Sequence, residues 1–286
     1  MPHPSLRNSQ VVLTGGASGI GRQMALQAAA RGAAVLATDI DQQGLQQTVE
    51  LGREQGLVIE RQLLDVADRQ AVFHFAEAHI PRLQGRRLVL INNAGVGLYS
   101  GSFADTELED FDWLLRINLW GPIWMTKAFY PYLLQQGQGH VVSLSSIFGL
   151  GGVANQSAYC TSKFGLRGFM ESLRMELLGT GVKTLLVLPG GVKTNIARNA
   201  TPRGNVATAA MHAQTVASFE REAPTSAESA ARQILNAIEK GRARLVIGRD
   251  GRAFDTLSRL FPVLYTKLLK KRIEQVFTNP YTSKEA

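Results

Sequence analysis

Short apolar runs and longer segments of helical periodicity alternate along most of this chain of 286 residues. The runs have the composition of buried strands and lie at residues 10–16, 33–39, 57–65, 86–95, 140–146, 183–191 and 243–248. The helical segments between them lie at 19–32, 41–56, 69–80, from about 106, from about 119, at 158–178 and after 227. Strands that alternate with helices form a parallel sheet covered on both faces. The sequence therefore predicts an α/β fold with a doubly wound parallel sheet in a single domain.

Composition narrows the class of protein. A hydrophobic content of 45% over this length suits one large globular domain. The single cysteine, Cys160, excludes an intramolecular disulfide and fits a reducing compartment. The first ten residues lack the apolar core of a signal peptide, and no apolar run is long enough to span a membrane. We therefore expect a cytoplasmic protein. Residues 195–226, rich in Ala, Thr and Asn, are expected to form an inserted helical or mobile segment.

Positive charge is concentrated at the C-terminus. Residues 240–286 carry 11 Lys or Arg and 4 Asp or Glu, so most of the net charge of +8 lies there. We expect a catalytic domain over residues 1–250 and a basic amphipathic helical extension over 251–286. No nucleic-acid motif accompanies the charge, so no nucleic-acid partner is expected.

In the extension, helical spacing places six apolar side chains on one face: Phe254, Leu257, Phe261, Leu264, Tyr265 and Leu268. Basic residues lie largely opposite this face, and Pro262 is expected to kink or split the helix. The helix either packs on the body or on a partner subunit, or contacts anionic lipid at a membrane surface.

The segment TGGASGIG follows the first strand directly. It places Gly15, Gly19 and Gly21 at the turn from strand to helix. Glycines let backbone amides approach a pyrophosphate, and a helix N-terminus favours negative charge. The turn therefore predicts a dinucleotide-binding site.

Asp39 ends the second strand, 18 residues after Gly21. A carboxylate there accepts hydrogen bonds from the adenosine ribose and repels a 2'-phosphate, so NAD is expected rather than NADP. Ser18 stands where a basic residue would have indicated NADP, and Arg22 lies inside the helix. Asp41 is the better candidate for capping the following helix.

Polar or small residues also end the third and fourth strands. Asp65 and Val66 are expected to contact adenine, and Asn92 and Ala94 of the NNAG motif to line the same nucleotide site. Ligands in sheets of this type bind at the carboxyl ends of the strands.

The segment YCTSK places Tyr159 four residues before Lys163, so both side chains project from one face of a helix. A lysine cation about 4 Å away would stabilise a phenolate by roughly 4 kcal/mol at an effective dielectric near 20. That interaction would lower the pKa of the phenol from about 10 by up to roughly 3 units. Taken alone, the pair is either a surface pair on a helix or a phenol acidic enough to act as a general base near neutral pH.

Four motifs together resemble the short-chain dehydrogenase/reductase family: TGGASGIG, NNAG, the segment from Tyr159 to Lys163, and PGGVKT at residues 189–194. The resemblance covers about residues 8–250 and implies a Rossmann-type fold, a nicotinamide cofactor and hydride transfer between an alcohol and a carbonyl. It places the catalytic tetrad on Asn118, Ser146, Tyr159 and Lys163. Ser145 is a close rival of Ser146 but points to the opposite side of an extended strand.

The resemblance also implies roles for these residues. Tyr159 is the acid/base, Lys163 holds the nicotinamide ribose, Ser146 bonds the substrate oxygen and Asn118 braces a water chain. Cofactor contacts fall on Gly15, Ser18, Gly19, Ile20, Gly21, Asp39, Asp65, Val66, Asn92, Ala94, Tyr159, Lys163, Pro189, Val192 and Thr194. No metal site is expected.

The expected function is an NAD(H)-dependent oxidoreductase acting on a lipophilic secondary alcohol or ketone. Apolar pocket walls are expected from Leu98, Phe148, Leu150, Val153 and the segment after Thr194. A homodimer or homotetramer is expected through the helices that begin near 119 and 158. The alternatives are an NADP(H)-dependent carbonyl reductase, a binding-only nucleotide scaffold, or an epimerase or dehydratase on the same fold.

Overall fold

The computed structural model describes residues 5–194, 196, 200–202 and 223–268. Its centre is a parallel sheet of seven strands in the order β11-β7-β6-β4-β1-β2-β3. The strands are β1 (Gln10–Thr14), β2 (Ala34–Asp39), β3 (Ile59–Leu63), β4 (Leu88–Asn92), β6 (Gly139–Leu144), β7 (Val182–Pro189) and β11 (Arg244–Ile247). The doubly wound α/β fold is therefore confirmed.

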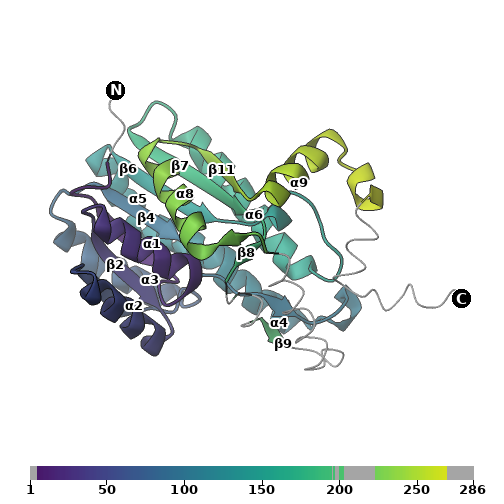
Figure 1. The fold of residues 1–286 in the computed structure, drawn as a ribbon, viewed down its shortest axis with the longest axis horizontal. Helices are drawn as coiled ribbons and strands as arrows, with labels where there is room; N and C mark the ends of the chain where they lie inside the picture. Colours follow the sequence, from purple (N-terminus) through teal and green to yellow (C-terminus); the bar gives the residue numbers. More distant parts are fainter. Residues whose placement is uncertain (1–4, 195, 197–199, 203–222, 269–286) are drawn as a thin grey trace, which may run out of the picture.

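Helices cover both faces of the sheet (Figure 1). One face packs against α1 (Gly19–Ala30), α2 (Gln42–Glu54) and α8 (Ala227–Glu239), through an apolar cluster that includes Met24, Leu45 and Ile234. The other face packs against α3 (Arg69–His79), α5 (Gly121–Gln136) and α6 (Ser157–Glu176). The central strands β4 and β6 are fully buried, which is why they are mostly apolar on both sides, whereas the edge strand β3 is largely exposed.

Local capping fixes where several helices begin. Asp41 accepts a hydrogen bond from the Gly44 amide at 3.0 Å and starts α2, as its position in the sequence predicted. Asp68 starts α3 and Ser226 starts α8 in the same way. Ser18, at the start of α1, makes no side-chain capping bond, which leaves that N-terminus available to a ligand.

Shorter elements surround the carboxyl edge of the sheet. α4 (Leu108–Leu115) continues through a π-helical turn (Arg116–Trp120) into α5. Short 3-10 turns occupy Ile80–Leu83, Phe103–Asp105 and Ile147–Gly149. Two small strand pairs join β5 (Leu98–Tyr99) to β9 (Thr201–Pro202), and β8 (Val192–Lys193) to β10 (Thr225–Ser226). Most of the expected insert at 195–226 lies outside the described residues.

The C-terminal extension is split, as Pro262 predicted. α9 (Arg249–Leu260) ends just before the proline, and a second short helical segment begins at Leu264. The expected single apolar face is wrong, because this break rotates the two pieces relative to each other. Tyr265 is buried, whereas Phe261, Leu264 and Leu268 are exposed. Residues 269–286 lie outside the described part, and none of the described helices combines the length and apolarity needed to span a membrane.

The topology fixes where a ligand can bind. From β1 the chain builds β2 and β3 on one side and then crosses to β4, β6, β7 and β11 on the other. The loops after β1 and β4 therefore leave the sheet in opposite directions and open a crevice between them.

Candidate active site

A cavity of about 500 Å³ opens at this crevice, along the carboxyl ends of the strands. Most of the cofactor residues predicted from the sequence line it: Gly15, Ser18, Gly19, Ile20, Gly21, Asp39, Asp65, Val66, Ala94, Lys163, Pro189, Val192 and Thr194. Ser146 lines it too, whereas Asn92, Asn118 and Tyr159 are not among the lining residues.

The glycine turn after β1 has a geometry that only glycine permits. Gly15 and Gly19 have φ values of +72° and +53°, in the left-handed region. A Cβ at Gly21 would overlap the carbonyl oxygen of Gly15, so α1 could not approach the turn with any larger residue there. The uncapped N-terminus of α1 faces the cavity beside this turn. Exposed amides and a helix dipole at one point fit the pyrophosphate of a dinucleotide.

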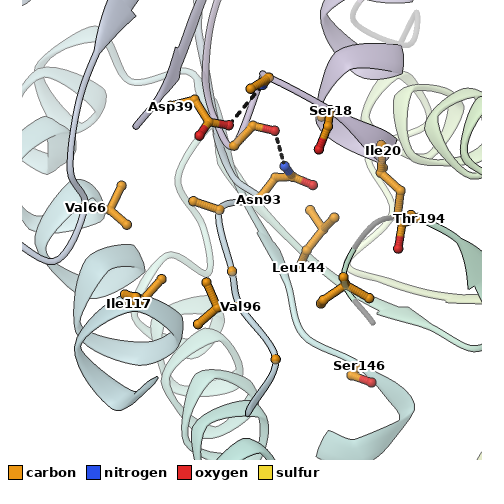
Figure 2. A pocket seen from close by; sticks show the side chains of 18 of the residues that line it. Ser18, Ile20, Asp39, Val66, Asn93, Val96, Ile117, Leu144, Ser146 and Thr194 are labelled. Atoms are coloured by element: carbon orange, nitrogen blue, oxygen red, sulfur yellow. Dashed lines mark hydrogen bonds between the residues drawn. The ribbon is translucent and has the colours of Figure 1, made fainter. Parts of the chain in front are cut away.

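Asp39 lies at the edge of the cavity (Figure 2), and both of its carboxylate oxygens accept hydrogen bonds. One oxygen accepts the Ala17 amide at 3.0 Å and the other accepts the Asp41 amide at 3.1 Å. Each carboxylate oxygen has a second lone pair and can still accept a bond from a ribose hydroxyl.

Arg22 fastens the same loop from the other side. Its guanidinium donates to the carbonyl oxygens of Ala17 and Gly44, and to the side chains of Gln47 and Thr48. The amide of Ala17 is therefore bonded by Asp39 and its carbonyl oxygen by Arg22. Arg22 joins α1 to α2 and does not line the cavity.

The structure corrects one residue of the NNAG motif. Asn92 is buried within the sheet, where its amide donates to the hydroxyls of Thr126 and Ser143. Asn93 lines the cavity instead, and its amide donates to the carbonyl oxygens of Thr14 and Gly15 (Figure 2). Asn92 ends the strand itself, so its side chain packs under α5, whereas Asn93 begins the loop.

Asn118 lies in the π-helical turn and is fully buried. Its amide forms a paired contact with one residue: Oδ1 accepts the Val96 amide at 2.8 Å, and Nδ2 donates to the Val96 carbonyl at 2.9 Å. Asn118 therefore fixes the cavity wall from Gly95 to Gly97. Turns of this type are rare and occur often at functional sites.

Ser146, Tyr159 and Lys163 come together next to the cavity. The hydroxyl of Ser146 hydrogen-bonds the Tyr159 side chain, and Lys163 Nζ lies 5.4 Å from the centroid of the Tyr159 ring. Nζ also donates to the Leu144 carbonyl at 3.1 Å. Ser145, the rival serine, donates to the Lys163 carbonyl at 2.9 Å and so supports the backbone of α6.

The expected low pKa of Tyr159 is not what this arrangement produces. Burial raises the pKa of Tyr159 to about 12, although the hydrogen bond with Ser146 acts in the opposite direction. Burial also lowers the pKa of Lys163 to about 8. Desolvation penalises both the phenolate of Tyr159 and the ammonium of Lys163. The pKa expected from the sequence considered only the attraction between these two charges and omitted the cost of burying them. Without a bound cofactor, the protein thus holds a neutral phenol at Tyr159 next to a Lys163 ammonium whose pKa is below its ordinary value.

Sequence reasoning missed several lining residues and misplaced others. The missed residues are Ala17, Ile40, Asp41, Leu64, Asn93, Gly95, Val96, Gly97, Trp113, Ile117, Leu144, Ser145 and Gly190, whereas Ile196 lies in the expected wall segment after Thr194. The expected walls Leu98, Phe148, Leu150 and Val153 are not among the lining residues, and Leu98 and Leu150 are buried in the core. Several missed residues adjoin a predicted one, so extending each motif by one position would have found them.

Comparison with known proteins agrees with this geometry. The family model for short chain dehydrogenases matches residues 9–205. SadH of Mycobacterium tuberculosis, named as an oxidoreductase, is 39% identical over 277 residues, which is 96% of this chain and 98% of SadH. Epidermal retinol dehydrogenase 2 of Mus musculus is 34% identical over 206 residues, covering 71% of this chain and 66% of that protein.

Solved structures show the same fold. A short-chain dehydrogenase/reductase from Burkholderia phymatum, solved in complex with NAD, has a TM-score of 0.78 at 24% identity and covers 96% of this chain and 98% of its own. Other solved members of the family hold NADP. The chain belongs to the short-chain dehydrogenase family of NAD(P)-dependent oxidoreductases.

Proposed function

We propose that the protein is an NAD(H)-dependent oxidoreductase that interconverts a lipophilic secondary alcohol and its ketone. The observation that carries this proposal is the grouping of Ser146, Tyr159 and Lys163 beside the cavity. A phenol, a hydroxyl that bonds it and an adjacent amine are the groups needed to move a proton to or from a substrate oxygen. A binding-only scaffold would need none of the three.

The residues divide the work as follows. The Ser146 hydroxyl bonds the substrate oxygen and stabilises charge that develops on it. The Tyr159 hydroxyl accepts the proton of the alcohol in oxidation and returns it in reduction. The Lys163 ammonium favours the phenolate and holds the ribose next to the reacting carbon. When bound, the nicotinamide would supply the hydride acceptor and a positive charge beside Tyr159. Asn118 keeps the Gly95–Gly97 wall in place.

Asp39 supports NAD over NADP. Asp39 and Asp41 both line the cavity at the end where the adenosine ribose would lie, and a 2'-phosphate there would meet two carboxylates. Lys163 is the only Lys or Arg among the described lining residues, and it belongs to the catalytic end. Arg22, the nearest alternative, already bonds four acceptors.

Replacing Asp39 with Ala tests the cofactor. We expect wild-type protein to bind NAD at least about tenfold more tightly than NADP by calorimetry, and Asp39→Ala to lose about tenfold of the NAD affinity. Asp68→Ala is the matched control, because Asp68 also bonds a backbone amide at a helix start but lies outside the cavity. A wild-type preference for NADP would overturn the argument and favour a carbonyl reductase.

The apolar lining supports a lipophilic substrate. Val96, Trp113, Ile117, Leu144 and Ile196 give the cavity a partly apolar lining. The similar retinol dehydrogenase acts, by its name, on a lipophilic alcohol. This chain shares with it the fold and the family, and a hydrophobic alcohol of comparable size is the class of substrate we propose.

We also propose that the protein is a homodimer or homotetramer that assembles through α5 and α6. Large apolar side chains are exposed on these helices, just before α5 and just after α6: Trp120, Leu134, Phe164, Met175 and Leu178. Trp120 and Trp124 stack at 5.9 Å and form a rigid aromatic surface at the start of α5. Aromatic surfaces of this type are enriched at the centres of protein interfaces.

A second surface supports contact with a membrane from the cytoplasmic side. Leu260, Phe261, Val263, Leu264 and Leu268 are all exposed within nine residues of chain at the C-terminal extension. The nearby basic residues Arg252, Arg259 and Lys267 are exposed as well. Apolar side chains flanked by cations match the chemistry of an anionic lipid surface.

Flotation with vesicles tests this contact. Wild-type protein is expected to float with phosphatidylcholine vesicles that contain phosphatidylserine. With vesicles of phosphatidylcholine alone, it is expected to remain at the bottom of the gradient. Val263→Glu with Leu264→Glu should abolish flotation, because two carboxylates replace the apolar contact. Val58→Glu is the matched control, since Val58 is exposed far from the extension. Equal flotation of all three proteins would contradict the proposal.

A further inference from the structure

The loop after β6 connects the proposed substrate site to the C-terminal extension. It runs from Ser146 through the turn Ile147–Gly149 to Val153, and it carries two groups next to the reacting centre. Ser146 bonds Tyr159, and the Phe148 ring meets the Tyr159 ring edge to face at 5.9 Å. Where this loop lies therefore decides where the substrate oxygen can bind.

The two ends of the loop are fastened within the catalytic domain. Ser146 Oγ accepts the Phe148 amide at 3.2 Å at the beginning. At the other end, the Val153 backbone interacts with the thiol of Cys160, which adjoins Tyr159 on α6. The middle, at Gly151 and Gly152, has to be held by something else.

Tyr265, from the C-terminal extension, holds the middle. Its hydroxyl accepts the Gly152 amide at 2.8 Å and lies 3.4 Å from the Gly152 carbonyl oxygen, to which it donates. Its ring is 8% exposed and stacks edge to face on Phe254 of α9 at 5.8 Å. Tyr265 thus anchors the middle of the loop, although it lies 113 residues after Gly152 in the sequence.

The fit between the two segments is close. A Cβ at Gly151 would lie 2.6 Å from the Phe254 ring and 3.1 Å from the Tyr265 ring, so glycine is needed for the rings to reach the loop. Gly251, in the first turn of α9, lies against Ile147 in the same manner, since a Cβ there would be 3.3 Å from that side chain. Aromatic rings packed against backbone leave the loop little freedom to move.

We propose that Tyr265 is a positioning residue for the substrate: by holding Gly152 it fixes the loop that places Ser146 and Phe148 against Tyr159. The proposal rests on the function proposed above, because it assigns this loop to the substrate side of the site. The cofactor turn lies at the opposite end of the cavity and makes none of these contacts among the described residues.

Tyr265→Phe tests the proposal, because it removes the hydroxyl and keeps the ring against Phe254. We expect KM for 2-octanol to rise about fivefold to tenfold, the equivalent of one hydrogen bond of about 1 kcal/mol. We expect the NAD dissociation constant to stay within about twofold and kcat to fall by less than KM rises. Deuterium exchange at a peptide spanning Gly149–Val153 should become about tenfold faster, since the Gly152 amide loses its acceptor.

Tyr132→Phe is the matched control. Tyr132 is also buried, and its hydroxyl donates to the Arg86 carbonyl at 2.7 Å, at the end of the sheet away from the cavity. This variant should lose a comparable amount of stability and leave both KM and loop exchange unchanged. An equal rise in KM in both variants would show a general structural effect and overturn the proposal.

The remaining outcomes are distinct. Unchanged exchange in Tyr265→Phe would show that the hydroxyl does not hold the loop, which sinks the proposal whatever KM does. Faster exchange with unchanged KM would leave Tyr265 with a structural role only, which also overturns it. If wild-type protein binds NAD and oxidises none of the alcohols from 2-butanol to 2-decanol, the proposed function fails first, and the positioning role fails with it.

Discussion

Replacing Tyr159 with Phe is expected to lower kcat for alcohol oxidation by about 10³-fold and to leave NAD affinity within about twofold. The substitution removes the group that accepts the proton and keeps the ring that packs against Phe148 and Lys163. General acid–base catalysis by one side chain contributes about 10²- to 10⁴-fold. Steady-state kinetics with NAD and 2-octanol, together with calorimetry of NAD, measures both quantities.

The direction of the pH dependence follows from the same site. Burial raises the pKa of Tyr159 to about 12, so little phenolate is present at pH 7 in the protein alone. Oxidation needs the deprotonated form, and its rate should therefore rise with pH until the pKa in the working complex is reached. Reduction needs the protonated form, and its rate should stay flat through neutral pH. A wild-type oxidation rate that falls between pH 7 and 9 would contradict Tyr159 as the base.

A control separates chemistry from folding. Tyr132→Phe removes a buried tyrosine hydroxyl far from the cavity and should retain full activity. If Tyr159→Phe kept more than about a tenth of the wild-type kcat, another group would have to carry the proton, and the role assigned to Tyr159 would be wrong.

Acid should destabilise the protein through His140, by about 3 kcal/mol between pH 7 and pH 4. His140 lies in β6 and is 1% exposed. Its pKa is lowered to about 3, first by burial and then by the charges of Arg87 and Lys183, with the Ile238 backbone acting in the opposite direction. Arg87 donates toward Nδ1 at 3.1 Å, so the neutral imidazole is the form that fits.

The sign follows from proton linkage. In the unfolded chain His140 titrates at its ordinary pKa of 6.5, so between pH 6.5 and pH 3 the unfolded state binds one more proton at this residue than the folded state. Stability from His140 is therefore complete above pH 6.5 and decreases as the pH falls toward 3.

Urea unfolding at pH 7, 5.5 and 4 measures this effect. His140→Gln should lose about 3 kcal/mol less than wild type over that range, because it has no imidazole to protonate. His74→Gln is the control, since His74 is exposed on α3 and its replacement should leave the wild-type slope intact. Identical slopes for wild type and His140→Gln would contradict the prediction.

The sequence was most informative where one backbone geometry demands one residue type. The glycine turn, the Asp41 cap and the succession of strands and helices in a parallel sheet could be predicted, because each depends on local spacing and on a rule for parallel sheets. Asn92 and Asn93 could not be told apart. β4 is buried on both faces, so alternation gives no signal for which asparagine leaves the sheet.

Two further expectations, the low pKa of Tyr159 and the single apolar face of the C-terminal extension, failed for the same reason. Both properties depend on packing in three dimensions. The pKa of Tyr159 is set by burial, and no spacing between Tyr159 and Lys163 reports burial. The apolar face expected for the extension ran across Pro262, although a kink or split was predicted there. Pro262 breaks the helix, and Tyr265 then turns inward to a glycine that precedes it by more than a hundred residues.

The desolvated amine of Lys163 has a consequence for covalent chemistry. An ammonium whose pKa is about 8 is partly an uncharged nucleophile at the pH of most cells, and this one borders an open cavity. A small acylating reagent or aldehyde that enters the cavity is therefore expected to react at Lys163. Because Lys163 is only 4% exposed, the cavity is its route to solvent, and a dinucleotide bound there would lie across that route.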